Sequence, residues 1–567
     1  ESVAVFINGG YIRDLLLGKC PDDLDLSLCL RGCPEEVNVG TLLDKVPGYA
    51  ADRADLGVVQ VKLATCLSDE SKNKNLDTFK AHFTIATGKK IEVDVMPTIG
   101  EERYDGDSRI PVRDERGTPE QDTLRRDLTI GAMLLQVRLV GAGDLRFDLL
   151  DYHGGLEDLQ KGLLRAPYPR DKTLEAVQAL VLRSDADKEL ATSLGLDDLP
   201  QDRAIQTLWW AKILIDDPLR VSRALRFAAK LQFSMDDTFW SAIPFALESL
   251  RTKVAGERKC TEYMKIGGYG LERCSDFFEI AFSRAFGPPS ARVRGAPALL
   301  GGQDEKRRVR GLSDVADFDL DLYRDLASSL RGVQEPSELL GCLLACGCFA
   351  AEFVGGGLGA AEEFAEACGG MSVSNAMKEA GSSVLGSAQA LAADAPPADR
   401  LDRGFAAAAG VSAEALCMHL HVWRSLQLPG HRNVPEDVSA ARRAVALKML
   451  KRTHPARHAA VEGCLGKLGC ARPAVRGGVL DTKGLLEVPG PLRQRVIVLL
   501  EVVLRMLHVT DPLETSDHLR ALFSAHPSIC EALASSVWYQ DDGKTLREEF
   551  AVKRDANPKK AKQAKRV

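Results

Sequence analysis

The chain opens with short apolar runs separated by turns, and later apolar residues recur every three or four positions. Short β-branched runs are typical of strands, whereas the longer period is typical of helices. We therefore predict a mixed sheet with a helix or two in residues 1–150, and helices almost throughout from about residue 216. The predicted strands are Val3–Ile7, Leu24–Leu30, Val58–Leu63, His82–Ala86 and Ile91–Met96.

The predicted fold class is an α/β head domain followed by an all-α neck, body and tail. A chain of 567 residues is long enough for several such domains. The pattern favours a head at 1–150, a neck at 151–290, a helical body and tail at 291–552, and a basic end at 553–567. Three stretches stand out within these domains: a charged helical insertion at 167–215, a loop or linker rich in Gly, Pro and Arg at 287–311, and thin, closely packed helical hairpins at 339–410.

Composition changes this picture little, because 45% hydrophobic and 27% charged residues are ordinary for a globular protein. The net charge of −6 means that any nucleic-acid surface must come from local clusters of Lys and Arg. The last fifteen residues carry seven basic side chains and one acidic one. This end is either a solvated tail or a contact for RNA or an acidic partner.

Fourteen cysteines are scattered along the chain without a Cys-x-x-Cys pair. Cys342, Cys346 and Cys348 lie in an apolar segment, where we expect buried free thiols that act as small hydrophobic side chains. Reduced thiols favour an intracellular protein. No stretch of about 18 apolar residues is present, so we expect no membrane span.

Candidate chemistry begins at Gly9 and Gly10, which follow a predicted strand and open an apolar helix. Glycines at such a junction let backbone N–H groups approach an anion. Asp23 and Asp25 follow, and residues two apart in a strand project from the same face. Two neighbouring carboxylates repel each other unless a cation such as Mg²⁺ lies between them. Taken alone, each pattern also fits a simple turn.

Together, residues 9–25 resemble the first motif of class II nucleotidyltransferases of the tRNA CCA-adding enzyme and poly(A) polymerase family. In that family the Asp pair binds two catalytic metal ions, and the glycines and the Arg at the position of Arg13 belong to the nucleotide site. The resemblance therefore implies two Mg²⁺ ions held by Asp23, Asp25 and a third carboxylate, for which Asp94 in the strand at 91–95 is the matching position.

The likeness continues in the same order along the chain. Residues 108–111, 117–119 and 125–130 resemble the eukaryotic branch of the family, which includes the yeast and plant enzymes. The Arg-Arg-Asp stretch helps hold the incoming nucleotide and its ribose in the family. This resemblance implies nucleotide-binding roles for Arg126 and Asp127.

Residues 216–227 resemble the family's base-selecting segment, in which an acidic pair and the first Arg form hydrogen bonds with the edge of the incoming base. A carboxylate and a guanidinium supply the acceptor and the donors that such a pairing needs. Asp217 and Arg220 lie three residues apart, so on one helix they would share a face. The implied base-selecting residues are Asp216, Asp217 and Arg220, with Arg223 and Arg226 placed to reach the triphosphate. An ordinary solvated helix face is the alternative for this segment taken alone.

Glu257 and Arg258 are similar to the pair that begins the family's neck helix, and we expect a structural role for them. The resemblance extends from about Val3 to Gly268. Three departures from the family pattern lie near the site: Gly131 replaces an expected Asn, residues 96–100 lack an expected Arg, and the stretch before Asp216 is about forty residues longer than in yeast-like relatives.

The resemblance implies an RNA 3′-end nucleotidyltransferase that adds CCA to tRNA from CTP and ATP by a two-metal mechanism. The expected partners are nucleoside triphosphates and the 3′ end of tRNA or another RNA, in a mitochondrial, cytoplasmic or nuclear setting. Two alternatives stay open: a poly(A)-adding enzyme, and a non-catalytic RNA-binding or structural subunit of a ribonucleoprotein assembly that retains the fold.

Overall fold

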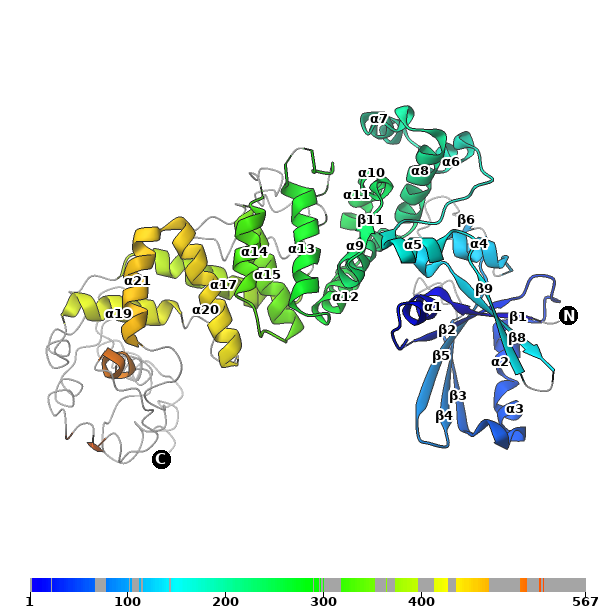
Figure 1. The fold of residues 1–567 in the computed structure, drawn as a ribbon, viewed down its shortest axis with the longest axis horizontal. Coiled ribbons are helices and arrows are strands. Elements are labelled where there is room, and N and C mark those ends of the chain that lie inside the picture. The colour runs from blue at the N-terminus through cyan, green and yellow to red at the C-terminus, as the bar shows by residue number, and fades with distance from the viewer. Residues whose placement is uncertain are drawn as a thin grey trace, which may run out of the picture. The chain divides into compact units, whose positions relative to one another are not determined.

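The computed structural model describes most of the first 294 residues and a series of helices further along the chain (Figure 1). The chain divides into two compact units, Glu1–Tyr269 with Ser283–Gly302 and Gly270–Phe282 with Gln303–Val567. The described residues are 3–21, 23–66, 78–100, 102–103, 112–113, 116–141, 144–288, 290–294, 296, 299, 318–351, 364, 373–395, 412–426, 435–468, 500–506, 520, 521 and 524.

A seven-stranded sheet forms the head, with strand order β3-β4-β5-β2-β1-β8-β9. Neighbouring strands pair antiparallel except for β2 and β5, which are parallel. The α/β head is confirmed, and all five predicted strands are present with shifted ends. The two strands at one edge, β8 and β9, were not predicted. The strands are β1 Ala4–Asn8, β2 Leu24–Cys29, β3 Val58–Cys66, β4 Thr78–Ile85, β5 Lys90–Pro97, β8 Leu134–Val140 and β9 Asp144–Leu150.

Alternation along the strands gives the sheet one apolar and one polar face. Val93 and Val95 of β5 are buried in a core with Leu28, Leu30 and Val39, whereas residues between them point to the opposite side. Two short helices that follow β2, α2 Val39–Leu43 and α3 Val46–Asp52, contact strands β3, β4 and β5. The polar face is thereby left for the chemistry described below.

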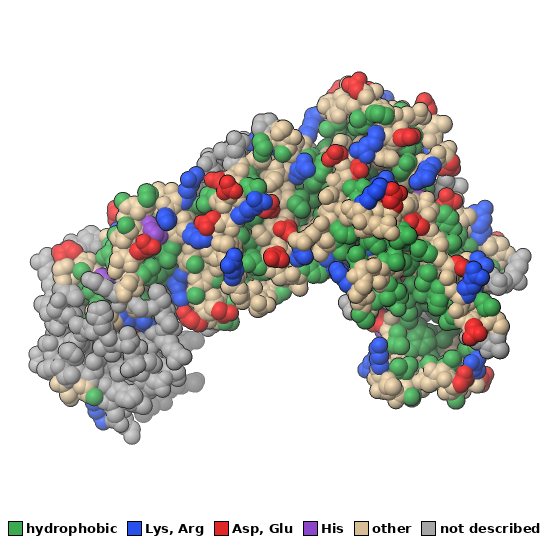
Figure 2. Space-filling model, in the orientation of Figure 1, with side chains coloured by type: hydrophobic (Ala, Val, Ile, Leu, Met, Phe, Trp, Pro, Cys, Tyr) green, Lys and Arg blue, Asp and Glu red, His purple; other side chains and the backbone are tan. Residues whose placement is uncertain are grey.

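The apolar face continues onto β8 and β9 but is open there. Leu139 pairs with Leu145, and Val137 pairs with Phe147. Leu139, Leu145 and Phe147 are each about half exposed or more. Figure 2 shows hydrophobic side chains gathered on the surface of the head. Exposed cross-strand apolar pairs explain why β8 and β9 are hard to recognise as parts of a buried sheet.

Helices form the neck within the same unit. Residues 167–215, expected as an insertion, contain two helices and most of a third, α8, whose Trp210 packs on Phe239 of α10 with ring centroids 5.1 Å apart. This stretch is therefore part of the neck's core. The neck helices are α5 Gly155–Lys161, α6 Leu174–Val181, α7 Asp185–Ser193, α8 Gln201–Asp216, α9 Leu219–Leu231, α10 Asp237–Ala242, α11 Pro244–Lys253 and α12 Gly256–Gly267.

The second unit is helical wherever it is described, as predicted. A Cβ added at Gly341 would lie 2.2 Å from the carbonyl oxygen of Met377, so the two helices that carry these residues pack backbone to backbone. Close packing of helices, as expected for residues 339–410, is therefore present between these two helices. The helices are α13 Leu271–Phe286, which joins the two units, α14 Leu320–Ser328, α15 Pro336–Ala350, α17 Asn375–Ala392, α19 Ala413–Ser425, α20 Glu436–Thr453 and α21 Pro455–Leu468.

Buried thiols and a buried ion pair lie in α15. Cys342, Cys346 and Cys348 are buried and in no disulfide, as predicted, and burial raises the pKa of the Cys342 thiol to about 12. The guanidinium of Arg442 on α20 donates from Nε to the Glu338 carboxylate over 3.1 Å. The thiols of Cys342 and Cys346, whose pKa values burial raises, are therefore protonated packing groups rather than nucleophiles.

Some predictions fall on residues outside the described ranges. The motif at 108–111, most of the linker at 287–311 and the basic end at 553–567 belong to this group. Within the described part of the chain, no helix combines the length and the apolar character that crossing a bilayer requires.

Candidate active site

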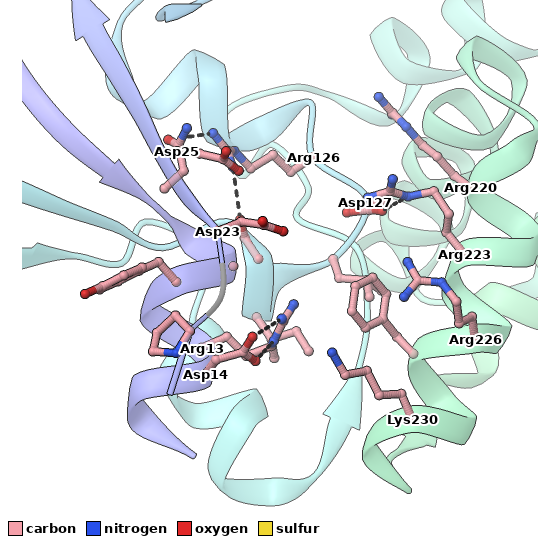
Figure 3. Close-up of a pocket in the computed structure, with 18 of the residues that line it drawn as sticks. Arg13, Asp14, Asp23, Asp25, Arg126, Asp127, Arg220, Arg223, Arg226 and Lys230 are labelled. Atoms are coloured by element: carbon pink, nitrogen blue, oxygen red, sulfur yellow. Dashed lines mark hydrogen bonds and ion pairs between the residues drawn. The ribbon is translucent and has the colours of Figure 1, made fainter. Parts of the chain in front are cut away.

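A cavity of about 760 Å³ in the first unit gathers most of the predicted site residues (Figure 3). Its lining comes from the polar face of the sheet, from the segment after α4 Pro119–Leu124, and from the neck helices α9 and α12. Ten predicted residues line it: Gly10, Arg13, Asp23, Asp25, Arg126, Asp127, Asp217, Arg220, Arg223 and Arg226. Gly9, Asp94, Asp216, Glu257 and Arg258 are absent from the lining.

The register of the sheet brings the predicted acidic residues together. Asp25 on β2 lies opposite Asp94 on the parallel strand β5, so both project from the polar face. Asp23 precedes β2 and is exposed at its start. Asp94 Oδ1 lies 2.9 Å from the ammonium group of Lys80, its cross-strand neighbour on β4.

The carboxylates of this group act on one another. Burial, and then the negative charges of Asp94 and Asp23, raise the pKa of Asp25 above its ordinary value, against the opposing effects of Arg126 and Lys80. A carboxyl group whose pKa is raised in this way is destabilised in its charged form, and a nearby cation would relieve the repulsion between the carboxylates. The sequence argument that paired carboxylates require a cation therefore applies to the folded chain.

Asp23, Asp25 and Asp94 offer only carboxylate oxygens, which are the ligands that a hard divalent cation prefers. Among the described residues, however, no three acidic, His or Cys side chains are grouped closely enough to hold a metal ion. Asp94 is turned toward Lys80 instead. Of the three predicted metal ligands, Asp23 and Asp25 thus face the cavity, and Asp94 lies beside them.

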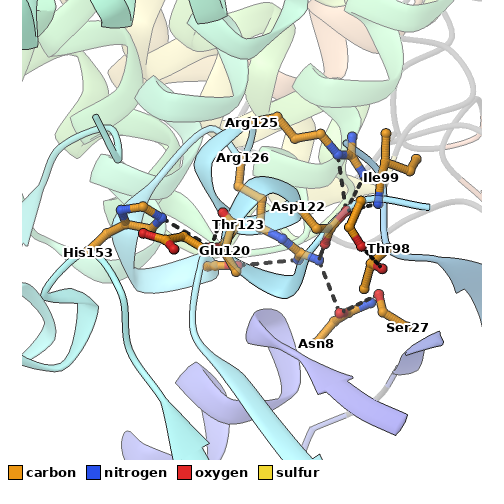
Figure 4. A network of polar contacts seen from close by, with 12 residues as sticks. Asn8, Ser27, Thr98, Ile99, Glu120, Asp122, Thr123, Arg125, Arg126 and His153 are labelled. Atoms are coloured by element: carbon orange, nitrogen blue, oxygen red, sulfur yellow. Dashed lines mark hydrogen bonds and ion pairs between the residues drawn. The ribbon is translucent and has the colours of Figure 1, made fainter. Parts of the chain in front are cut away.

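A buried network holds Arg126 at the cavity wall (Figure 4). Its guanidinium donates to Asp122 over 2.8 Å and to the side-chain oxygen of Asn8 over 3.0 Å, and Ser27 donates to the same oxygen over 2.9 Å. Asp122 is fully buried and also accepts from Arg125 and from the backbone N–H of Ile99. Burial raises the pKa of Asp122, but the positive charges of Arg125 and Arg126 lower it by more, so the net shift of the pKa is downward.

The sequence explains why this network forms where it does. Thr118 and Gln121 cap the start of α4 reciprocally, and Pro119 occupies its first turn. The helix then ends at Leu124, so Arg125 and Arg126 lie one turn after Asp122 and reach back to it. Sequence reasoning missed Asp122, although its spacing of three and four from two arginines was a usable signal.

A buried histidine packs behind this network. Thr123 Oγ1 lies 3.1 Å from Nε2 of His153 and donates to the carbonyl oxygen of Glu120, so Nε2 of the imidazole is the donor to Thr123. Burial lowers the pKa of His153 to about 4. The imidazole is therefore neutral near pH 7 and serves as a structural hydrogen-bond donor.

Gly9 has a packing role, and Gly131 leaves space in the cavity wall. A Cβ added at Gly9 would lie 2.2 Å from the carbonyl oxygen of Gly131, so α1 Gly9–Leu16 begins in direct contact with this backbone. A Cβ added at Gly131 would meet no heavy atom within 4 Å. Gly131 lines the cavity, so the Cβ of a larger residue at this position would meet no neighbour there.

One geometric prediction about the base-selecting segment is wrong. Asp217 and Arg220 do not share a helix face, because α8 ends at Asp216, Asp217 has an extended backbone, and α9 begins at Leu219 after Pro218. Proline disfavours the helical conformation in the residue before it. Both side chains nevertheless line the cavity, since the break directs Asp217 toward it.

The acidic pair has two different environments. Asp216 accepts from Lys212 over 2.6 Å, one helical turn earlier, outside the cavity lining. Asp217 accepts from the backbone N–H of Leu219 over 3.3 Å and lies 3.3 Å from a guanidinium nitrogen of Arg258. Arg258 on α12 thus supports the break between α8 and α9. Glu257 is exposed in the first turn of α12.

Most of the cavity's arginines are paired with carboxylates. Arg223 donates to Asp127 over 2.9 Å, and Arg226 donates to buried Glu262 over 2.7 Å. Arg13 binds the carboxylate of Asp14 through two nitrogens, at 2.8 and 2.9 Å. Although burial raises the pKa of Asp127, Arg223 and Arg220 lower it to give a net downward shift.

The lining residues that sequence reasoning missed include Lys230 at the end of α9, Lys265 on α12, and Tyr269 just after α12. Lys230 lies one helical turn after Arg226, so the same period that suggested Arg223 and Arg226 could have found it. Lys265 and Tyr269 come from another helix, and their approach to the cavity depends on how α12 packs against α9.

Known proteins are similar to the first part of the chain. Residues 5–165 match the family model described as the poly A polymerase head domain. Two fungal relatives match about half of this chain, which supports the expected likeness to the eukaryotic branch.

The chain is 28% identical over 270 residues to the mitochondrial CCA tRNA nucleotidyltransferase of Candida glabrata, an alignment that covers 47% of this chain and 40% of that protein. It is 27% identical over 272 residues to the Saccharomyces cerevisiae enzyme of the same name, covering 47% and 38%. The alignments thus span less than half of these relatives. A solved CCA-adding enzyme, apo form II, is similar over 92% of both chains with 16% identity and a TM-score of 0.47.

Proposed function

We propose that the chain is a template-independent RNA 3′-end nucleotidyltransferase, and that its reaction is CCA addition to tRNA from CTP and ATP. One observation carries this proposal: a single cavity is lined by the head carboxylates Asp23 and Asp25 and by the neck residues Asp217 and Arg220. The first pair supplies negative charge for a cation, and the second supplies an acceptor and donors for a base edge.

The base-selecting role needs an acceptor and a donor that are both accessible to the nucleotide. Arg220 donates to the carbonyl oxygen of Ile213 over 3.2 Å and, among the described residues, is in no ion pair. Its remaining N–H groups are therefore free for a ring nitrogen or carbonyl acceptor. Asp217 keeps an exposed contact with Arg258, which fixes the carboxylate without burying it.

Asp23 and Asp25, with Asp94 beside them, would hold divalent metal ions, which supply charge neutralisation for the triphosphate and a lowered pKa for the RNA 3′-hydroxyl. The chain's own residues position the reactants. Arg126, fixed by Asp122 and Asn8, lies at the wall beside Asp25, and Asp127 with Arg223 lies toward the neck. The nucleotide would bridge these two sides.

The names of the two fungal relatives support this assignment and extend it to a mitochondrial setting. Localisation of an epitope-tagged chain in cells would check the compartment. Among the alternatives, the retained carboxylates and the accessible Arg220 favour an enzyme over a non-catalytic subunit of a ribonucleoprotein.

The test is an extension assay with the purified protein. A tRNA transcript that lacks its 3′ CCA is incubated with Mg²⁺ and each nucleoside triphosphate singly and in combination, and the products are sequenced. We expect addition of C, C and A in order and no extension with UTP or GTP. A homopolymeric A tract would identify a poly(A)-adding enzyme instead. If the protein forms no product and binds neither CTP nor ATP, it is a non-catalytic subunit rather than an enzyme.

A further inference from the structure

The cavity has a basic end that none of the recognised motifs explains. Lys230, Lys265 and Tyr269 line it together with Arg226. In Figure 3 the side chain of Lys230 lies below Arg226 on the side of Arg13 and Asp14, away from Arg220. Two neighbouring helices of the neck thus contribute cations to the end of the cavity opposite the base-selecting residues.

The pairing of the cavity's cations distinguishes Lys230 from the rest. The lining contains eight Lys and Arg side chains, and six of them contact a carboxylate: Arg13 with Asp14, Arg125 and Arg126 with Asp122, Arg223 with Asp127, and Arg226 and Lys265 with Glu262. In the described part of the chain, Arg220 and Lys230 are in no ion pair. These two cations stand at opposite ends of one cavity.

Lys230 is held in place by an aromatic ring rather than by an anion. Its ammonium nitrogen lies 5.2 Å from the ring centroid of Tyr269, and the Tyr269 hydroxyl accepts from Arg226 over 3.3 Å. A cation–π contact orients an ammonium group but leaves its charge uncompensated. Lys265 is 49% exposed and lies 3.2 Å from Glu262, a carboxylate that Arg226 already neutralises. This end of the cavity therefore has spare positive charge.

We propose that Lys230, supported by Lys265 and Tyr269, is the subsite for the terminal phosphates of the incoming nucleotide and for the pyrophosphate released from it. The inference rests on the proposed function and adds residues to it. With the base at Asp217 and Arg220, a triphosphate that extends along the cavity has its terminal phosphates toward Arg13 and Lys230. A lysine is suited to this task because its compact charge donates to phosphate oxygens without a fixed fork geometry.

The chemistry gives Lys230 a definite part in the reaction. The RNA 3′-oxygen forms a bond to the α-phosphorus, the bond from that phosphorus to the bridging β-phosphate oxygen breaks, and its electron pair leaves with pyrophosphate. The hydroxyl proton is released to solvent. Lys230 would donate hydrogen bonds to the leaving phosphates and stabilise the charge that they gain.

Calorimetric titration tests this subsite without requiring transfer. Inorganic pyrophosphate, CTP and CMP are titrated into the wild-type protein and into Lys230→Met, with and without Mg²⁺. We expect the variant to bind pyrophosphate and CTP about tenfold more weakly and CMP unchanged, which is the scale of one hydrogen bond to a charged group. Lys230→Arg should retain most of the affinity, and Lys265→Met should show a smaller loss of the same kind.

Lys212→Met is the matched control, because Lys212 lies on neck helix α8, pairs with Asp216 and is not in the cavity lining. An unchanged ratio of CTP to CMP affinity in Lys230→Met, in a variant that keeps the wild-type circular dichroism spectrum and Tm, would overturn the subsite. So would a wild-type protein that binds no pyrophosphate. If Lys230→Met instead weakens only the binding of a tRNA transcript, the phosphate held there belongs to RNA and the proposal is wrong.

The outcomes separate this inference from the proposed function. A protein that binds pyrophosphate through Lys230 but extends no RNA keeps the subsite and loses the proposed activity. A protein that extends tRNA with equal pyrophosphate affinity in wild type and Lys230→Met keeps the activity and loses the subsite.

Discussion

The acidic and the basic parts of the cavity handle charge in opposite ways. On the acidic side, burial and then the negative charges of Asp94 and Asp23 raise the pKa of Asp25. On the basic side, Arg223 and Arg226 are each paired with a carboxylate at hydrogen-bonding distance. Paired cations stabilise the fold that presents them, whereas crowded carboxylates work against it, and groups held in an unfavourable state are typical of functional sites.

The largest expected effect comes from removing one charge on the acidic side. Asp25→Asn should lower transfer at least about a thousandfold, since metal-assisted charge stabilisation contributes several kcal/mol. The same change should raise Tm, because a carboxylate with a raised pKa is less stable charged in the folded chain than in the unfolded one, and its charge opposes folding above that pKa. Extension assays and thermal melts at pH 7 check both parts.

Asp55→Asn is the control for Asp25→Asn, because Asp55 is an exposed carboxylate paired with Arg53. It should leave transfer unchanged. If Asp25→Asn extends tRNA at the wild-type rate, the carboxylate of Asp25 is not needed for transfer, and the contrast between the acidic and the basic side of the cavity does not concern catalysis.

Asp122→Asn should affect stability most. Breaking a buried ion pair by removing one partner costs about 3–5 kcal/mol, and both Arg125 and Arg126 lose their carboxylate here. The pKa of Asp122 is lowered in the folded chain, so its contribution is present above the unfolded pKa of about 4 and is lost as pH falls through the lower folded value. Urea unfolding at pH 7 and at pH 3 should show a large difference between wild type and variant at the first pH and a smaller one at the second. An equal difference at both would argue against an ionic role.

Arg220→Ala should change base choice rather than stability. Loss of a bidentate contact to a base edge removes about 1–3 kcal/mol of discrimination, which is about a tenfold to hundredfold gain in relative use of UTP over CTP and ATP. Arg220 donates within the protein only to the carbonyl oxygen of Ile213, so we expect a small effect on Tm. Competition assays with mixed nucleotides measure the ratio, and an unchanged ratio would exclude a base-selecting role.

Gly131→Asn should give the smallest effect, an improvement. The Cβ of the new side chain has room, because it meets no heavy atom within 4 Å. One added hydrogen bond to the nucleotide is worth about 1 kcal/mol, so KM for CTP should fall by about fivefold to tenfold with little change in kcat. Gly131→Ala separates this effect from backbone stiffening, since it adds the Cβ without the amide. A KM that falls equally in both variants would assign the gain to the backbone.

Several parts of the fold and site could be predicted from the sequence because their signals are local. The resemblance implied that the strand with Asp94 brings a third carboxylate to the Asp pair, and the register sets Asp94 opposite Asp25 on the polar face. The apolar segment around Cys346 correctly predicted buried thiols. The edge strand β9 was missed because its apolar side chains are largely exposed and no long apolar run marks it.

Other features could not be predicted from the motifs. The spacing of Asp122 indicates its ion pairs with Arg125 and Arg126, but not its contact with the Ile99 backbone or the bond from Arg126 to Asn8, which come from distant parts of the chain. The helix that was expected to carry both Asp217 and Arg220 is broken before Pro218. A helical period indicates which residues share a face only while the helix continues.

The sequence by itself determined which side chains are available: the carboxylates after the glycine turn, the arginines spaced along α9, and the missing amide at Gly131. Only the tertiary structure decided which of them meet, since α9 and α12 must pack beside the sheet before Lys230, Tyr269 and Asp23 can line one cavity. It also decided which cations are paired. Spacing along a chain fixes local neighbours, but the compensation of a charge depends on groups brought from far away, and those are fixed by packing.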